Sequence, residues 1–224
     1  MNVIIIHSIM AVITRSKSRK NRRRKISDSR AERVERVERA GLDCDELDRI
    51  LECDERYDDL LYCVSYDCDI LSVDFLIKRG VDVNKVTKHS DGGTSTSLYA
   101  AAQEGHLIVV TKLIAAGADV DAATNDGATP LFIAAENDHN DVVTKLIASG
   151  ADVNMARTTD GSTPLYMAAS KCNVAIVANL LQHGADKSIR GWKNRTPLEQ
   201  VHANNRFFDE RACARAAIIG LLTP

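Results

Sequence analysis

The sequence lacks the short motifs by which enzymes are usually recognised. It contains no glycine-rich phosphate loop, no nucleophile elbow and no pair of carboxylates placed for acid–base chemistry. Its Asp-Gly steps at 91, 126 and 160 are typical of turns rather than of calcium loops. The sequence therefore predicts a protein that is not an enzyme and that uses no cofactor, metal or small-molecule substrate.

The cysteines are not arranged for metal binding or redox catalysis. No Cys-x-x-Cys pair occurs, and no histidine lies at metal-ligand spacing from any of Cys44, Cys53, Cys63, Cys68, Cys172 and Cys213. We expect reduced thiols that pack as small hydrophobic residues, which fits the cytoplasm or the nucleus. A zinc site assembled from distant parts of the chain is the alternative.

A long apolar stretch is also missing. Residues 2–14 are uncharged and largely apolar, but they are fewer than the roughly 20 residues of a membrane-spanning helix. Positive charge follows this stretch rather than preceding it, so neither a transmembrane segment nor a secretory signal is expected. Translation from Met10 is an alternative that would remove most of the stretch.

Charge is divided unevenly along the chain. Residues 1–41 hold 12 Lys or Arg and 4 Asp or Glu, whereas the remaining 183 residues hold 17 and 27. Residues 15–25 form a basic arm with no aromatic residue among its charges, so a base-stacking surface is not indicated. The role of the arm stays open between nuclear import, contact with nucleic acid or anionic lipid, and no function. Its charges are Arg15, Lys17, Arg19, Lys20, Arg22, Arg23, Arg24 and Lys25.

One pattern repeats along the rest of the chain. Equivalent leucines are separated by 37, 33, 34 and 33 residues, at Leu61, Leu98, Leu131, Leu165 and Leu198. In the central copy, Thr129 and Pro130 suit the start of a short helix. A second helix follows and ends at Gly150, which suits a left-handed C-terminal cap. Two such short helices cannot bury their apolar faces alone, so the units must stack.

The repeated letters resemble those of ankyrin repeats. They include Gly-x-Thr-Pro-Leu at 127–131 and 161–165, a pair of alanines, Gly105-His106, and Gly-Ala-Asp-Val-Asn at 150–154. The resemblance covers about residues 57–222. It implies an all-α solenoid of about five helix-turn-helix units with β-hairpin fingers and divergent terminal units. The histidine usual after Thr-Pro-Leu is replaced by Tyr99, Phe132 and Tyr166.

This resemblance and the local composition divide the chain into segments. We expect a disordered apolar and basic arm at 1–26, a charged helical connector at 27–41 and an N-terminal capping helix at 42–56. The repeat units would fall at about 57–90, 91–123, 124–157, 158–190 and 191–222, with a last helix at about 206–222. His106 and His139 recur at the turn between helices, which predicts turn hydrogen bonding rather than catalysis.

In ankyrin-like stacks, partner proteins are bound by the fingertips and by the exposed, concave side of the first helices. The resemblance carries this role to the helix positions Tyr66, Asp67, Gln103, Glu104, Glu136, Asn137, Ser170 and Lys171. The corresponding fingertip positions are Asp91, Asn125, Asp126, Thr159, Asp160, Trp192 and Lys193.

Several alternatives stay open at this face. Its acidic members predict a basic partner segment, for which residues 15–25 of the same chain are one candidate. Trp192 is either a binding hot spot or packs on a neighbouring finger or the C-terminal cap. The expected function is a protein-binding scaffold or adaptor. The alternative is a nuclear regulator whose basic arm contacts DNA or RNA, or serves in import, while the repeats recruit a protein.

Overall fold

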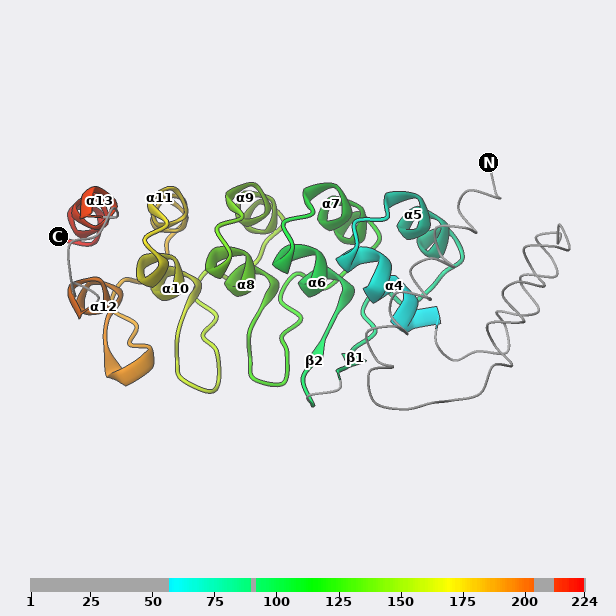
Figure 1. Ribbon diagram of the computed structural model, residues 1–224, viewed down its shortest axis with the longest axis horizontal. Helices are drawn as coiled ribbons and strands as arrows, with labels where there is room; N and C mark the ends of the chain where they lie inside the picture. The colour runs from blue at the N-terminus through cyan, green and yellow to red at the C-terminus, as the bar shows by residue number, and fades with distance from the viewer. Residues whose placement is uncertain (1–56, 90–91, 204–211, 224) are drawn as a thin grey trace, which may run out of the picture.

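A computed structural model describes residues 57–89, 92–203 and 212–223, which form five consecutive pairs of helices. The first helices lie in one layer and the second helices in a layer beside it (Figure 1). The pairs are α4 (Tyr57–Tyr66) and α5 (Ile70–Lys78), α6 (Ser97–Gln103) and α7 (Leu107–Ala115), α8 (Pro130–Glu136) and α9 (Asn140–Ala148), α10 (Pro164–Lys171) and α11 (Val174–Gln182), and α12 (Pro197–Ala203) and α13 (Ala212–Leu222). The predicted arm, connector and capping helix lie outside the described residues.

A threonine begins each of the three central first helices, as the sequence predicts for Thr129. The Thr129 hydroxyl oxygen accepts a hydrogen bond from the backbone N–H of Phe132 at 3.1 Å, and Pro130 occupies the first turn. Thr96 and Thr163 cap α6 and α10 in the same way. The caps fix where each first helix starts relative to the turn before it.

The end of α9 confirms the role predicted for Gly150. This glycine has φ +93, and the next N–H, that of Ala151, donates to the carbonyl of Leu146 at 3.1 Å. Such a left-handed cap satisfies carbonyl groups that the helix leaves open. The chain then turns away from the second-helix layer toward the next unit.

The core runs through the whole stack between the two layers. Leu98 and Leu131 are fully buried, and the alanine pairs that follow them are also inaccessible to solvent. These small residues let neighbouring first helices approach closely. In the first unit, Ser72 takes a position that is valine in the central copy, and its buried hydroxyl donates to the Asp69 carboxylate at 2.6 Å.

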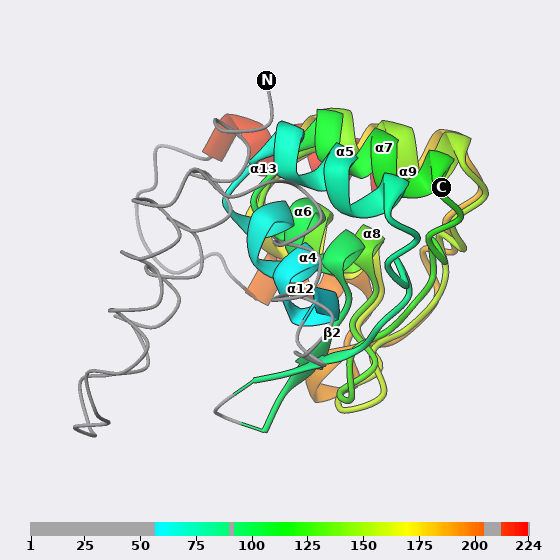
Figure 2. The same cartoon turned by 90° about the vertical axis from the view of Figure 1, so that its right-hand side faces the viewer.

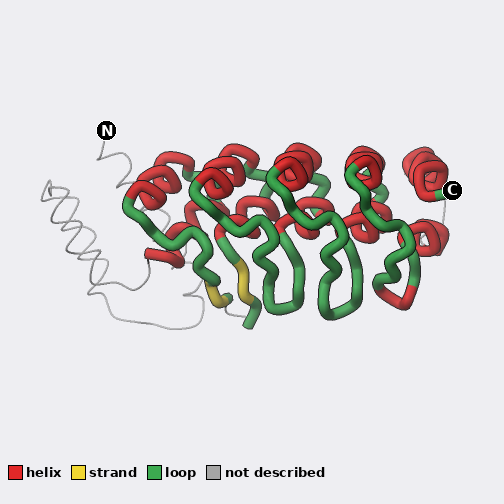
Figure 3. The backbone as a smooth tube through the Cα atoms, turned by 180° about the vertical axis from the view of Figure 1, so that it is seen from behind, coloured by secondary structure: helices red, strands yellow, loops and turns green. Residues whose placement is uncertain are grey.

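The joints between units project from the helix layers as fingers (Figure 2). Strands β1 (Thr87–Lys88) and β2 (Thr94–Ser95) pair antiparallel in the first finger, with Thr87 opposite Ser95. Among the described residues, this finger alone contains paired strands (Figure 3). The following fingers close through single turns, because their shorter joints leave too few residues for a strand on each side. The last finger contains the 3-10 helix η1 (Trp192–Asn194).

Hydrogen bonds cross between units at the turns that join the two helices. His106 Nε2 lies 2.9 Å from the carbonyl oxygen of Tyr66, and His139 Nε2 lies 3.0 Å from that of Gln103. The prediction that these histidines serve the turns is confirmed. The structure adds that each bond reaches the carboxyl end of the preceding first helix, so the histidines set the spacing of the stack.

Asparagine residues link the loops on the other edge of the stack. The Asn154 side chain accepts from the N–H of Asp186 at 2.7 Å and donates to the carbonyl of Gly184 at 3.2 Å. Asn84 makes the same two bonds to the second unit. Asp121 takes the equivalent place in the second unit. Its carboxylate accepts from the N–H of Asp152 at 3.1 Å but has no N–H with which to donate.

We expect the substitution Asp121→Asn to stabilise the protein by about 0.5–1.5 kcal/mol at pH 7, because the amide can donate to Gly150. Burial raises the pKa of Asp121 above 3.8; the hydrogen bond from the Asp152 N–H opposes this shift, and the negative charges of Asp152 and Asp119 add to it. A raised pKa means that the ionised carboxylate costs stability above that pKa. The cost is lost as the pH falls toward 3.8, so the advantage of the variant should shrink there.

Urea unfolding at pH 7 and near pH 4 would measure both effects. The reciprocal substitution Asn154→Asp is the matched control and should destabilise at pH 7, because it removes the donor to Gly184. An Asp121→Asn variant that is less stable than the parent at pH 7 would contradict the role assigned to this loop position.

Candidate protein-binding face

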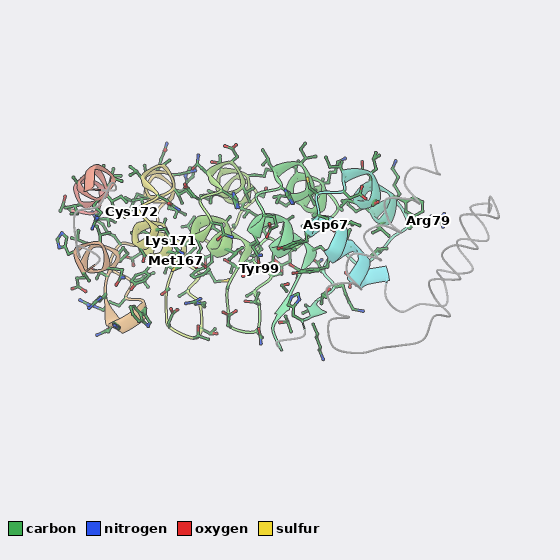
Figure 4. All side chains as sticks on the ribbon, in the orientation of Figure 1. Asp67, Arg79, Tyr99, Met167, Lys171 and Cys172 are labelled. Atoms are coloured by element: carbon green, nitrogen blue, oxygen red, sulfur yellow. The ribbon has the colours of Figure 1, made fainter. Side chains whose placement is uncertain are left out.

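The inner face comprises the carboxyl ends of the first helices and the fingers beside them. The predicted helix positions occur here as two adjacent residues in each of four units, and Figure 4 labels two of them, Asp67 and Lys171, together with Tyr99. Asp67, Asn137 and Lys171 are exposed, whereas Tyr66, Gln103, Glu104, Glu136 and Ser170 are partly buried. The structure therefore brings these residues onto one continuous surface. Asp91 lies outside the described residues.

Aromatic residues near the start of the first helices pack against the fingers. They occupy the position at which the resemblance implies histidine, and Tyr62, Phe132 and Tyr166 each contact the finger that follows. The Tyr62 and His89 rings lie with centroids 5.0 Å apart, and the Tyr166 hydroxyl donates to the carbonyl of Trp192 at 3.1 Å. The departure from the family pattern therefore changes the contact at this position but not the fold.

Arg157 forms the most extensive of these contacts. Its guanidinium carbon lies 5.0 Å from the centroid of the buried Phe132 ring, a cation–π arrangement. Its Nε and Nη2 atoms donate to the Asp160 carboxylate at 3.1 and 2.6 Å. These bonds from Arg157 hold the pKa of Asp160 below its usual value. The contacts with Phe132 and Asp160 thus fix the orientation of the Arg157 guanidinium on the inner face.

Tyr99 of α6 lies near two acidic residues, Asp126 and Glu136. Burial is the main cause that raises the pKa of its phenol to about 12, and the charges of Asp126 and Glu136 add to the shift. Tyr99 therefore stays protonated and can donate a hydrogen bond at neutral pH. The Asp126 carboxylate accepts a hydrogen bond from the Thr124 hydroxyl of the same finger.

The fingers are tied to one another rather than standing separately. The Asn125 amide donates to the carbonyl of Gly92 at 3.2 Å, and its backbone N–H donates to the hydroxyl of Thr94 at 3.1 Å. One unit further, the N–H of Thr158 donates to the carbonyl of Asp126 at 3.0 Å. The predicted fingertip residues Asn125 and Asp126 thus also hold neighbouring fingers in register, while Thr159 is exposed.

Trp192 combines a fixed backbone with a half-exposed ring. Its N–H donates to the Ser162 hydroxyl at 3.3 Å, and 48% of the residue is exposed. The Lys193 ammonium lies 4.0 Å from the centroid of the indole. The main chain of Trp192 packs on the preceding unit, while the indole and the neighbouring cation face outward from the last finger.

Ion pairs neutralise part of the predicted acidic surface. Glu136 pairs with Lys171 at 3.6 Å, and Asp160 pairs with Arg157 at 2.6 Å. Among the described residues, Asp67, Glu104 and Asp126 have no such pair and lie in the first three units. Lys193 lies at the opposite end. The inner face is therefore negative toward the first units and positive toward the last finger.

Arg157, Phe132 and Tyr166 also belong to this face, although they are not among the residues predicted for it from the sequence. Two signals were available. The joint that contains Arg157 has one more residue than the shortest joints, and an aromatic residue replaces histidine in three consecutive units. Neither signal shows that the aromatic of one unit meets the following finger, because that contact depends on the stacking geometry.

The described ranges contain neither a candidate metal site nor a membrane-spanning helix. Within 57–89, 92–203 and 212–223, no group of three or more His, Cys, Asp or Glu residues could hold a metal ion. No helix in those ranges is long and apolar enough to cross a membrane. Cys68 and Cys172 carry free thiols.

The stacked helix pairs, the fingers and the hydrogen bonds between units define a solenoid repeat protein. A family model of three ankyrin repeats matches residues 60–157, and a model of one ankyrin repeat matches residues 160–192. Together they cover more than half of the chain, which belongs to the ankyrin-repeat family. Ankyrin repeats generally mediate protein–protein interaction.

A segment of 56 residues is 48% identical to the human protein named ankyrin repeat and KH domain-containing protein 1. The segment is 25% of this chain but only 2% of that protein. The similarity is therefore one between repeats, and this chain spans a very small part of the length of the relative that it matches.

Proposed function

We propose that this chain is a non-enzymatic scaffold or adaptor whose inner face binds an extended segment of a partner protein. The observation that carries the proposal is a row of polar side chains, one per unit, held on a rigid frame. Asp67, Glu104, Asn137 and Lys171 take the equivalent position in four successive units. A surface that is already ordered loses little conformational entropy when it binds.

The charges of the row favour one orientation of the partner. Asp67 and Glu104 are acidic, Lys171 is paired with Glu136, and Lys193 provides the positive end on the last finger. A segment with basic residues at one end and acidic residues at the other fits this face. Such complementarity mainly governs the rate of association and the choice of partner.

We expect the charge reversals Asp67→Lys and Glu104→Lys to abolish most partner binding while leaving the fold intact, because neither side chain belongs to the core. The measurement is quantitative affinity capture from a cell extract, followed by titration of the retained protein. Loss of two close charge complements should weaken binding by about tenfold or more, since about 1.4 kcal/mol corresponds to a factor of ten.

The control variant carries the same change in net charge on the second-helix layer. It combines exposed positions of α7, α9 and α11: Ala115→Lys, Ala148→Lys, Ala175→Lys and Gln182→Lys. Partners should be retained by this control and lost from the inner-face variant. If both variants retain the same proteins with equal affinity, the inner face is not the binding surface.

A second candidate function rests on the basic arm at residues 15–25, with eight basic residues and no acidic one. In this alternative, the arm contacts DNA or RNA or acts in nuclear import while the repeats recruit a protein. Replacing the eight basic residues by glutamine in the full chain would remove any steeply salt-dependent binding to nucleic acid. Weak, salt-independent binding in the parent protein would argue against a nucleic-acid role.

A further inference from the structure

An apolar patch lies on the second-helix layer of the stack, just after the turns that join the first and second helices. The outer patch consists of Leu71, Leu107 and Ile108, which are 53%, 38% and 56% exposed. All three belong to the first turns of α5 and α7. They are thus large apolar side chains that the described fold leaves in solvent, and they are grouped rather than scattered.

An ion pair shows that the members of the outer patch are neighbours. Lys112 of α7 reaches Asp74 of α5 at 2.7 Å. Leu71 precedes Asp74 by three residues, and Ile108 precedes Lys112 by four, so each lies on the same helix face one turn earlier. Leu71 and Ile108 therefore take equivalent places on the adjacent helices α5 and α7, and Leu107 directly precedes Ile108.

The outer patch stops at the third unit. Where α7 has Leu107 and Ile108, α9 has Asn140 and the exposed Asp141. The turn before α9 adds a second exposed carboxylate, Asp138. Neither carboxylate makes an ion pair with another residue of the described ranges. The partial positive charge at the start of α9, about half a unit, is smaller than these two charges.

We propose that residues 2–14 of this chain dock on the outer patch and thereby place the basic residues 15–25 beside Asp138 and Asp141. The order of the two sequences matches: an uncharged stretch with Val3, Ile4, Ile5 and Ile6 precedes the basic run. On the stack, apolar α5 and α7 precede acidic α9. Docking covers apolar side chains on both partners.

The other segments that precede residue 57 fit the outer patch less well. Residues 45–53 carry four acidic residues and one arginine. Asp141 would repel the net negative charge of this segment. Residues 27–40 have only Val34 and Val37 as large apolar residues. The chain between residues 14 and 57 is long enough for docking, because even a flexible linker of this length spans about 35 Å on average, whereas neighbouring helices are about 8–10 Å apart.

Docking here would make the basic arm part of the folded protein. Its charges would lie at the start of α9, where Asp138 directly follows Asn137 of the inner-face row. The docked arm would therefore border the surface proposed to bind a protein partner. Release of residues 2–14 would be required before the arm could serve as an import signal or bind nucleic acid.

Photo-crosslinking in the full chain tests this inference directly. A benzophenone amino acid replaces the exposed Ile108, and the matched control places it at Ala175, the equivalent position of α11. We expect crosslinks from position 108 to residues 2–14 of the same molecule, at a yield several-fold above that from position 175. Mixed nitrogen-14 and nitrogen-15 protein distinguishes intramolecular from intermolecular products by mass spectrometry.

The substitutions Asp138→Asn and Asp141→Asn test the contribution of charge. Asp138 has φ +65, a conformation that asparagine also tolerates, so the fold should persist. The crosslink yield from position 108 should fall several-fold and become insensitive to salt. An unchanged yield would overturn the placement of the basic run. Crosslinks to residues 27–56, crosslinks between two copies, or none at all would overturn the docking itself.

Discussion

Replacement of Leu131 by alanine is expected to lower the free energy of unfolding by about 2–5 kcal/mol. Leu131 is fully buried in α8, which packs against α6, α10 and α9. Removal of its side chain leaves a cavity in the middle of the stack, where neighbouring units on both sides depend on the contact. Urea unfolding followed by circular dichroism would measure the loss.

Leu61→Ala is the matched comparison at the first unit. Leu61 is also fully buried, but among the described helices α4 packs mainly against two, α6 and α5. A terminal unit of a repeat protein supports fewer interfaces, so its loss couples less strongly to the rest. We expect Leu61→Ala to lower the free energy of unfolding by about 2 kcal/mol or less. Equal losses for the two variants would contradict a stack whose stability decreases toward its first unit.

The substitution Gly127→Ala is expected to have the second large effect. Gly127 has φ +84, which costs most other residues about 1–2 kcal/mol. An added Cβ would also lie 2.5 Å from the backbone nitrogen of Thr158, the atom that donates to Asp126. Relief of that overlap requires the two fingers to separate, at a further cost of about 1–3 kcal/mol.

Gly150→Ala separates the two causes. Gly150 has a similar φ of +93, but its added Cβ would meet no atom within 4 Å. Its cost should therefore be the conformational one alone, about 1–2 kcal/mol. We expect Gly127→Ala to lose more stability than Gly150→Ala and also to weaken partner binding, because it displaces fingers of the inner face. Identical losses in unfolding experiments would show that the contact between fingers contributes nothing.

Local sequence determined the helices and their ends. Thr129 and Pro130 start α8, and Gly150 ends α9, because capping depends on residues within one turn of the helix end. The regular spacing of Leu98, Leu131 and Leu165 also predicted a stack, since each unit has an apolar face that it cannot cover alone. These features, and with them the family, could be obtained from the sequence.

The sequence also predicted the position of the inner face but not its state of charge. It placed Glu136 and Asp160 among residues that give a negative potential. Lys171 and Arg157, which neutralise them, stand 35 residues after Glu136 and three residues before Asp160. The first pairing joins two separate units, and no local pattern indicates which side chains of neighbouring units meet.

In the second-helix layer, too, the sequence did not predict which side chains of neighbouring units meet. Leu71 and Ile108 belong to helices that the periodic pattern predicts, but their mutual proximity follows from the ion pair between Asp74 and Lys112 across two units. The sequence by itself thus determined the units, their caps and their order. Only the tertiary structure decided which charges stay unpaired and which apolar groups stay exposed, because both depend on the distance between side chains that stacking brings together.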